Sequence, residues 1–240
     1  MRVFVLGHRG MLGHMVCKVL LDNGINIVTT DSKWPDCKWI SNFDGNYVVN
    51  CIGTIPKKIK NFEKSDYSVN YELPIWLDKN MKCRVIHVGT DLDGYSEYGD
   101  SKYKAESHLL ENGTKTKIIK SSIIGPELYS KNSLFEWFMQ SKNEVSGEYE
   151  AYWNGITTLQ WAKICKDLIL DWDYYPVLNK PHTDCISKYE LLKIIKDVFK
   201  KNISINKSKK NKVDMCLNGT METPNIKKQI IKLKEFYYDN

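Results

Sequence analysis

A tyrosine and a lysine four residues apart form the most chemically distinctive pair in the sequence. Tyr98 and Lys102 lie in the stretch "HVGTDLDGYSEYGDSKYKAE", and Thr90 precedes Tyr98 by eight residues, at the end of an apolar run. Residues four apart share one face of a helix, so the Lys102 ammonium can stabilise the Tyr98 phenolate and lower the phenol pKa from its usual value of about 10. The Thr90 hydroxyl can hold the oxygen of a bound ketone while Tyr98 delivers a proton to it. These three residues predict the reduction of a carbonyl group by hydride.

The same spacing occurs a second time, in Tyr189 and Lys193. This second pair comes late in the chain, in an expected helix that no strand precedes, so we interpret its tyrosine as a packing residue. Position along the chain, and not spacing alone, assigns the chemistry to Tyr98.

Three glycines follow the first apolar run, in the stretch "VFVLGHRGMLG". Gly7 allows a sharp turn, Gly10 leaves room for a phosphate near the backbone, and Gly13 allows a helix to pack close to the strand. The free N–H groups in the first turn of that helix, at the positive end of its dipole, favour an anion. The loop therefore predicts a site for the pyrophosphate of a dinucleotide; an ordinary strand-to-helix turn is the alternative.

Charged residues near this loop bear on the choice between NADPH and NADH. Asp31 ends the second expected strand, where a carboxylate can bind the ribose hydroxyls of NADH and repel a 2′-phosphate. Arg9 lies inside the glycine loop and Lys33 follows the strand, and both side chains can pair with a phosphate. We favour NADPH, with NADH as the alternative.

Apolar runs that alternate with helical patterns are typical of an α/β fold with a Rossmann-like, doubly wound parallel sheet. Strands are expected near 2–6, 25–30, 47–52, 84–88 and 117–121, with a poorly defined strand somewhere in 36–41. Helices are expected after Gly10, where Gly24 ends the helix, and over 66–79 and 101–111. The first domain, 1–125, would bind the dinucleotide and carry the candidate catalytic residues.

The chain changes character after about residue 126. We expect an aromatic helix in "SLFEWFMQ", a turn at Gly147, an amphipathic helix capped by Thr157 or Thr158, a helix over 188–200 and then a polar tail. This small C-terminal region, 126–240, would be mostly substrate-binding and packed closely on the first domain.

Composition limits the class of protein. The chain of 240 residues can bury a sizeable core, and no run approaches the ~20 apolar residues of a membrane span. The formal charge of +6 comes largely from polar lysine runs without interleaved aromatic residues, so a solvated surface is favoured over nucleic-acid binding. The seven cysteines form no Cys-x-x-Cys and the five histidines show no ligand spacing. We therefore expect reduced thiols, no metal site and a cytoplasmic protein that begins without a signal peptide.

The glycine loop, Thr90, Tyr98 and Lys102, in this order, resemble the extended short-chain dehydrogenase/reductase superfamily. More narrowly, the chain resembles the dTDP-4-dehydrorhamnose reductase family and its relatives that modify nucleotide sugars. The segments that carry the resemblance are "GHRGMLG", "HVGTD", "SVN", "KSSIIGPEL", "NGITTLQWAKI" and "ISKYELLKII". The last three are similar to a polysaccharide-biosynthesis branch, and the resemblance spans nearly the whole chain.

The resemblance implies roles for individual residues. Tyr98 would be the general acid, Lys102 would lower its pKa and hold the nicotinamide ribose, and Thr90 would bind the keto oxygen. Besides Tyr98 and Lys102, the residues that would bind the cofactor are Gly7, Arg9, Gly10, Met11, Leu12, Gly13, Asp31, Lys33, Cys51, Ile52 and Gly53. Asp91, Trp153 and Asn154 would lie near the substrate, although Trp153 could equally belong to the core. Asn70 would organise the region behind the site or cap helix packing.

The implied activity is NADPH-dependent reduction of the 4-keto group of a nucleotide-linked 4-keto-6-deoxyhexose. A UDP-linked 2-acetamido sugar is favoured over the dTDP-linked rhamnose precursor, and a homodimer is expected, as in relatives. Leu92 stands where the most similar branch carries a cysteine, so an added epimerase step would need Asp91, Asp93 or Cys51 as its proton-shuttling group. An arginine expected near the C-terminus is also missing, because the chain reads "DMCL" there. The alternatives are a non-catalytic NADP-binding sensor or scaffold subunit and, more distantly, a nucleic-acid binder.

Overall fold

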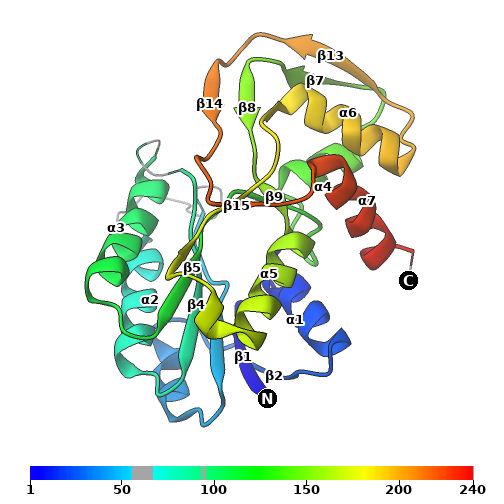
Figure 1. Ribbon diagram of the computed structural model, residues 1–240. Coiled ribbons are helices and arrows are strands. Elements are labelled where there is room, and N and C mark those ends of the chain that lie inside the picture. Colours follow the sequence, from blue (N-terminus) through cyan, green and yellow to red (C-terminus); the bar gives the residue numbers. More distant parts are fainter. Residues whose placement is uncertain (56–66, 93, 95, 240) are drawn as a thin grey trace. The chain divides into compact units, whose positions relative to one another are not determined.

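The computed structural model describes residues 1–55, 67–92, 94 and 96–239 (Figure 1). The chain forms two compact units. Unit 1 comprises 1–120 and 162–179, and unit 2 comprises 121–161 and 180–240. The expected first domain, 1–125, therefore differs from unit 1, because a later segment of the chain returns to it.

Unit 1 is built on a six-stranded parallel sheet with the strand order β10-β5-β4-β3-β1-β2. The strands are β1 (Arg2–Leu6), β2 (Asn26–Thr29), β3 (Tyr47–Asn50), β4 (Arg84–Val88), β5 (Thr116–Ile119) and β10 (Leu178–Asn179). Strands β1, β3, β4 and β5 are almost wholly buried, as the continuous apolar runs predict for a sheet covered on both faces. The predicted α/β fold with a parallel Rossmann-like sheet is confirmed.

Helices cover both faces of this sheet. They are α1 (Gly13–Asp22), α2 (Ser68–Asn80), α3 (Glu97–Asn112) and the part of α5 (Thr158–Leu170) that belongs to unit 1. In Figure 1, α2 and α3 lie on one side of the sheet and α1 and α5 on the other. The core under α2 joins apolar side chains of three strands to that helix: Phe4, Leu6, Val48, Val85, Leu73 and Leu77.

The expected strand in 36–41 is wrong, because a 3₁₀ helix, Asp36–Asn42, takes its place. Cys37 and Ile40 are buried from that helix, and a spacing of three suits a 3₁₀ turn rather than the alternation of a strand. Helix α3 also begins earlier than expected, since the Ser96 hydroxyl caps it by accepting from the Gly99 N–H at 3.1 Å. Tyr98 therefore lies in the first turn of α3.

Unit 2 combines short strand pairs with helices. Its strands are β6 (Ile123–Ile124), β7 (Glu144–Glu148), β8 (Ala151–Trp153), β9 (Ile156–Thr157), β11 (Pro181–His182), β12 (Ile186–Ser187), β13 (Ser204–Ser208), β14 (Val213–Met215) and β15 (Met221–Glu222). They pair as β12-β8-β14, β13-β7, β11-β15 and β6-β9. Its helices are α4 (Leu134–Gln140), α6 (Lys188–Phe199), α7 (Ile226–Tyr237) and the start of α5.

Two expectations for this region are wrong. Gly147 lies within β7 rather than in a turn, because the neighbouring strand β13 pairs with it. The polar tail is also structured: it holds β13, β14, β15 and α7, and α7 buries Ile226, Ile230 and Leu233 along one face. Among the residues described, no helix is long and apolar enough to cross a membrane.

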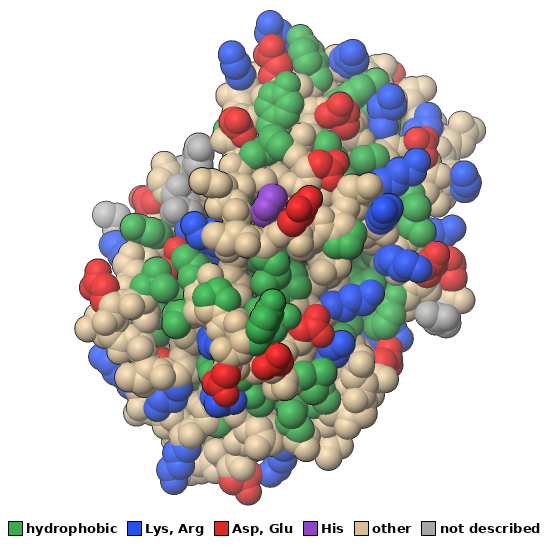
Figure 2. Space-filling view, in the orientation of Figure 1, with side chains coloured by type: hydrophobic (Ala, Val, Ile, Leu, Met, Phe, Trp, Pro, Cys, Tyr) green, Lys and Arg blue, Asp and Glu red, His purple; other side chains and the backbone are tan. Residues whose placement is uncertain are grey.

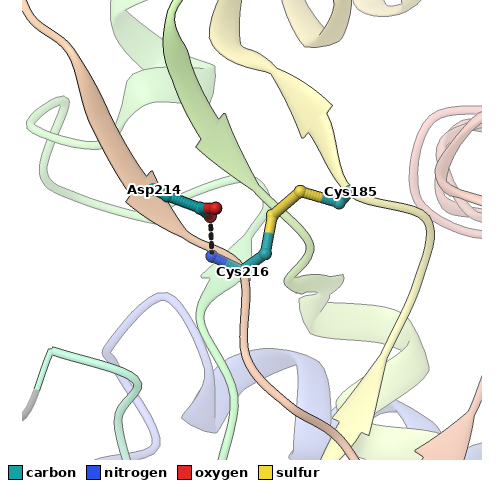
Figure 3. A group of neighbouring side chains, drawn as sticks. All are labelled: Cys185, Asp214 and Cys216. Carbon is teal, nitrogen blue, oxygen red and sulfur yellow. Dashed lines mark hydrogen bonds between the residues drawn. A yellow bond between two sulfur atoms is a disulfide. The ribbon is translucent and has the colours of Figure 1, made fainter.

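The expectation that all thiols are reduced is wrong for Cys185 and Cys216, which form a disulfide (Figure 3). Their Cα atoms are 5.9 Å apart, within the range that a disulfide spans. The other five cysteines are free. On the face shown in Figure 2, Lys and Arg side chains are interspersed with Asp and Glu rather than gathered in one basic stripe.

Candidate active site

The glycine loop forms a tight turn between β1 and α1. Gly7 has a φ of +77°, a conformation that L side chains rarely adopt, and its carbonyl accepts from the Gly10 N–H at 2.9 Å. A Cβ atom at Gly13 would lie 2.2 Å from the Gly7 carbonyl oxygen. A side chain at Gly13 would therefore push α1 away from the turn, and a side chain at Gly7 would strain the turn and press on Cys51 and Ile52. The N–H groups in the first turn of α1 are the expected anion site.

A cavity of about 860 Å³ opens at the carboxyl ends of β1, β2 and β3. Ligands of doubly wound sheets bind at this edge, where the strand order reverses. Most of the predicted cofactor residues line the cavity: Gly7, Arg9, Gly10, Asp31, Lys33, Cys51, Ile52 and Gly53. Met11, Leu12 and Gly13 are not among its lining residues. Sequence reasoning missed Trp34, Lys38 and Thr54, which also line it.

The two residues with opposite expected effects on cofactor choice are paired with each other. The Arg9 guanidinium lies 2.8 Å from the Asp31 carboxylate, and His8 Nε2 lies 3.7 Å from the other Asp31 oxygen. Arg9 and Asp31 are 60% and 61% exposed, and exposed ion pairs contribute at most about 1 kcal/mol. A phosphate could therefore replace the carboxylate as the partner of Arg9 at little cost.

The predicted catalytic residues meet beyond the end of β4. Thr90 lies close enough to Tyr98 for its side chain to affect the pKa of the Tyr98 hydroxyl. One turn further along α3, the Lys102 ammonium donates to the carbonyl oxygen of Val88, the last residue of β4, at 2.7 Å. Thr90 and Lys102 are buried, so the three functional groups lie in a largely desolvated site.

Burial dominates the pKa values of this site. It raises the pKa of Tyr98 to about 12 against the opposing hydrogen bond from Thr90, and nearby Asp91 and Tyr67 raise it further. Burial lowers the pKa of Lys102 to about 8, with Cys51 and Glu106 opposing that change. Lys102 is not among the groups that shift the pKa of Tyr98 in this structure, and its expected effect on that pKa stays a prediction. Tyr98 is therefore protonated at pH 7.

Asn70 joins the cofactor cavity to the catalytic helix. Its side-chain oxygen accepts from the Thr54 N–H at 2.8 Å, and its amide nitrogen donates to the Thr54 carbonyl at 3.0 Å and to the Ser101 hydroxyl at 3.2 Å. Ser101 in turn donates to the carbonyl of Tyr98 at 2.7 Å. A Cβ atom at Gly53 would lie 3.7 Å from the Lys102 nitrogen. The loop after β3 therefore runs directly beside Lys102.

Sequence reasoning missed a buried polar pair behind this site. Asn50 and His87 are paired on the neighbouring strands β3 and β4, and the Asn50 amide nitrogen lies 3.2 Å from His87 Nδ1. The Asn50 oxygen accepts from the Ile52 N–H at 3.1 Å and so holds the start of the loop after β3. Burial, and secondarily Lys102, lower the pKa of His87 well below its usual value. The available signal was a polar residue within each of two otherwise apolar runs.

The expected substrate residues fall in different units. Asp91 is buried in unit 1, near enough to Tyr98 to affect its pKa. Trp153 and Asn154 belong to unit 2, where the Asn154 side chain bonds both the N–H and the carbonyl of Leu217, at 2.7 and 2.9 Å. Trp153 is 9% exposed, in accord with the alternative that it is a core residue. Asp93 lies outside the described residues.

One group of residues outside these sites offers ligand atoms for a metal. Within the described part of the chain, only Cys185, Asp214 and Cys216 place three such atoms within 4.8 Å of one another (Figure 3). The two sulfur atoms are bonded to each other, so they are not available as thiolate ligands in this structure.

Comparison with known proteins shows which solved structures share this fold. No protein-family model and no curated protein matches the sequence. Solved structures match it over nearly its full length. A dTDP-4-dehydrorhamnose reductase from Clostridium acetobutylicum has a TM-score of 0.82 at 16% identity, covering 98% of this chain and 99% of that chain. The Bacillus anthracis dTDP-4-dehydrorhamnose reductase, solved in complex with NADP, has a TM-score of 0.80 at 15% identity, covering 100% and 99%.

Epimerases share this fold as well. The Thermotoga maritima UDP-glucose 4-epimerase, solved with UDP-glucose, has a TM-score of 0.73 at 15% identity, covering 100% of this chain and 99% of that chain. The structural likeness to dTDP-4-dehydrorhamnose reductases that the sequence motifs predict is therefore confirmed. At these identities the comparisons establish the fold, and the chemistry must be argued from the site.

Proposed function

We propose that this protein is an NADPH-dependent reductase of the 4-keto group of a nucleotide-linked 4-keto-6-deoxyhexose. The observation that carries the proposal is the candidate catalytic group itself: a neutral Tyr98 beside Thr90, one helical turn from a buried Lys102. This group lies beside the loop that lines the cavity at the carboxyl edge of the sheet. The structural likeness to nucleotide-sugar reductases and epimerases supports the same reaction class.

The cavity residues fit a dinucleotide. The left-handed turn at Gly7 and the close approach of Gly13 to the Gly7 backbone require glycine at both positions, and the resulting turn into α1 suits a pyrophosphate at the start of that helix. Arg9, Lys33 and Lys38 supply positive charge to the cavity, and Arg9 and Lys33 would hold a 2′-phosphate. NADPH would supply the hydride when bound, and the NADP-bound relative from Bacillus anthracis supports this choice.

Four residues of this chain would have separate roles in the reduction. Thr90 and Tyr98 would hold the keto oxygen, and Tyr98 would donate its proton to that oxygen as negative charge develops there. The ammonium of Lys102 would offset the charge of the resulting phenolate. Asn70 would hold the loop after β3 against α3 through its hydrogen bonds to Thr54 and Ser101.

The finer assignments rest on sequence resemblance. A UDP-linked 2-acetamido sugar is the first substrate to test and the dTDP-linked rhamnose precursor the second, with Asp91, Trp153 and Asn154 as substrate residues. An added epimerase step would use Asp91 rather than Cys51, because burial raises the pKa of the Cys51 thiol far above neutral. We also propose a homodimer and a cytoplasmic location, where a disulfide such as Cys185–Cys216 is uncommon.

The test is the substitution Tyr98→Phe, with Tyr189→Phe as the matched control because Tyr189 has the same spacing to a lysine. Titration with NADPH, followed by tryptophan fluorescence, should give the same affinity for both variants and the wild type. Turnover of 4-keto-6-deoxy sugar nucleotides should fall by roughly 10²–10⁴ in Tyr98→Phe only, as expected for the loss of a positioned acid. Unchanged turnover would show that Tyr98 is not the acid. Binding without turnover in the wild type would favour the sensor.

A further inference from the structure

The disulfide joins two segments on either side of one strand. In the three-stranded sheet of unit 2, β8 lies between β12 and β14. Cys185 directly precedes β12 and Cys216 directly follows β14, so the bond crosses the end of β8 (Figure 3). The two cysteines are 31 residues apart in the sequence, and the bond therefore restrains a long stretch of unit 2.

Hydrogen bonds of Asn154 join the same two segments. Asn154 follows β8 directly and is buried, and its side chain pairs with the backbone of Leu217, the residue after Cys216. The backbone carbonyl of Asn154 accepts from the Thr183 N–H at 3.0 Å, two residues before Cys185. The disulfide and Asn154 therefore hold the segment 214–217 jointly. We call these two connections the 214–217 clamp.

This sulfur pair differs from the other cysteines in its access to solvent. Of the seven cysteines, Cys185 alone is exposed; Cys216 is partly exposed, as are Cys17 and Cys51, whereas Cys37, Cys83 and Cys165 are buried. Thiol reagents react with accessible sulfur atoms. The Asp214 carboxylate, whose oxygen accepts from the Cys216 N–H at 2.9 Å, lies beside both sulfurs. Its negative charge disfavours a thiolate at either cysteine.

We propose that Cys185–Cys216 is a thiol–disulfide exchange site for dithiol reductants and that its redox state sets the mobility of the 214–217 clamp. A thiolate of the dithiol attacks Cys185 Sγ, the Cys185–Cys216 bond breaks, and Cys216 leaves as a thiolate that takes up a proton. The second thiol of the reductant then displaces Cys185 from the mixed disulfide. The protein gains two electrons and two protons, and the reductant is oxidised to its disulfide. The proposal does not depend on the reductase activity.

The first measurement is on the native wild-type protein. Dithiothreitol without denaturant, followed by iodoacetamide and peptide mass spectrometry, should label Cys185 and Cys216. In a parallel sample, oxidised dithiothreitol added to the reduced protein before iodoacetamide should leave both cysteines unlabelled. Hydrogen exchange at the Leu217 amide should then accelerate on the order of tenfold in the reduced protein. A peptide from β3 should exchange at the same rate in both forms. Resistance of the bond to native reduction, its absence after oxidation, or unchanged Leu217 exchange would overturn the proposal.

Two substitutions test the disulfide and the Asp214 charge separately. Cys216→Ser should show the fast Leu217 exchange with and without oxidant, so dependence on oxidant in this variant would count against the site. Asp214→Asn keeps both cysteines and removes the charge, and its dithiol form should re-oxidise several-fold faster than wild type near pH 7, because more thiolate is present. A rate equal to or slower than wild type would overturn the assigned effect of Asp214.

Discussion

Replacing Lys102 with methionine should change the stability of the protein and its activity in opposite directions. Methionine keeps an unbranched apolar side chain of similar length and removes the charge. Burial lowers the pKa of Lys102 from 10.5 to about 8, and a difference of this size corresponds to about 3 kcal/mol by which the buried charge destabilises the folded state at pH 7. The variant also leaves the Val88 carbonyl without its 2.7 Å donor, which costs about 1–2 kcal/mol. We therefore expect Lys102→Met to be more stable than wild type by about 1–2 kcal/mol at pH 7, and inactive.

The pH dependence of the stability difference between Lys102→Met and wild type tests whether the buried charge causes it. Because the pKa of Lys102 is lower in the folded state than in the unfolded state, the destabilisation is fully present below about pH 8 and disappears as the pH rises towards 10.5. The stability advantage of Lys102→Met over wild type should therefore shrink between pH 8 and 10. Other groups titrate in both proteins and cancel in the difference.

Urea unfolding followed by tryptophan fluorescence at pH 7 and pH 9.5 would measure both effects. Lys104→Met is the matched control, because Lys104 is an exposed lysine on the same helix, and its substitution should change stability by less than about 0.5 kcal/mol. A Lys102→Met variant less stable than wild type at pH 7 would refute the reasoning. So would a stability difference that is the same at both pH values.

Two further predictions concern the cofactor cavity and the pair behind it. Arg9→Ala should raise the Kd for NADPH about tenfold and leave the Kd for NADH nearly unchanged. Arg2→Ala, which removes another exposed arginine paired with an aspartate, should change neither value in the same fluorescence titration; equal losses for both cofactors would contradict the assignment. His87 is neutral when folded, so the unfolded state gains protons as the pH falls below about 6.5 and stability falls with it. His87→Leu should therefore lose less stability than wild type between pH 7 and 5 in urea unfolding, and parallel losses would show that His87 is not the cause.

The features predicted correctly are those in which local sequence and tertiary structure agree. The run before Gly7 is buried on both faces of the sheet. The backbone leaves no room for a Cβ atom at Gly13, as the glycine spacing predicts. Tyr98 and Lys102 lie one turn apart in α3, as their spacing predicts. Such signals need no knowledge of distant contacts.

The errors arise where distant contacts decide the local structure. Strands β7 and β13 are polar and pair with each other, so alternation of apolar residues does not reveal them. Helix α7 is rich in lysine, and its apolar face becomes clear only at the spacing of Ile226, Ile230 and Leu233. Cys185 and Cys216 approach each other only because β12 and β14 flank β8, and cysteine spacing alone does not specify this.

The discontinuity of unit 1 has a consequence for biosynthesis. The sheet of unit 1 receives its last strand, β10, from residues that follow a long segment belonging to unit 2. During translation, β5 therefore remains an open strand edge until Leu178 and Asn179 have left the ribosome, and an unpaired edge can pair with another chain. A nascent chain that stalls after β5 would carry the complete glycine loop and Tyr98 and still expose this edge. Neither unit can be obtained by cutting the chain once, because unit 1 is complete only at residue 179 and unit 2 only at residue 240.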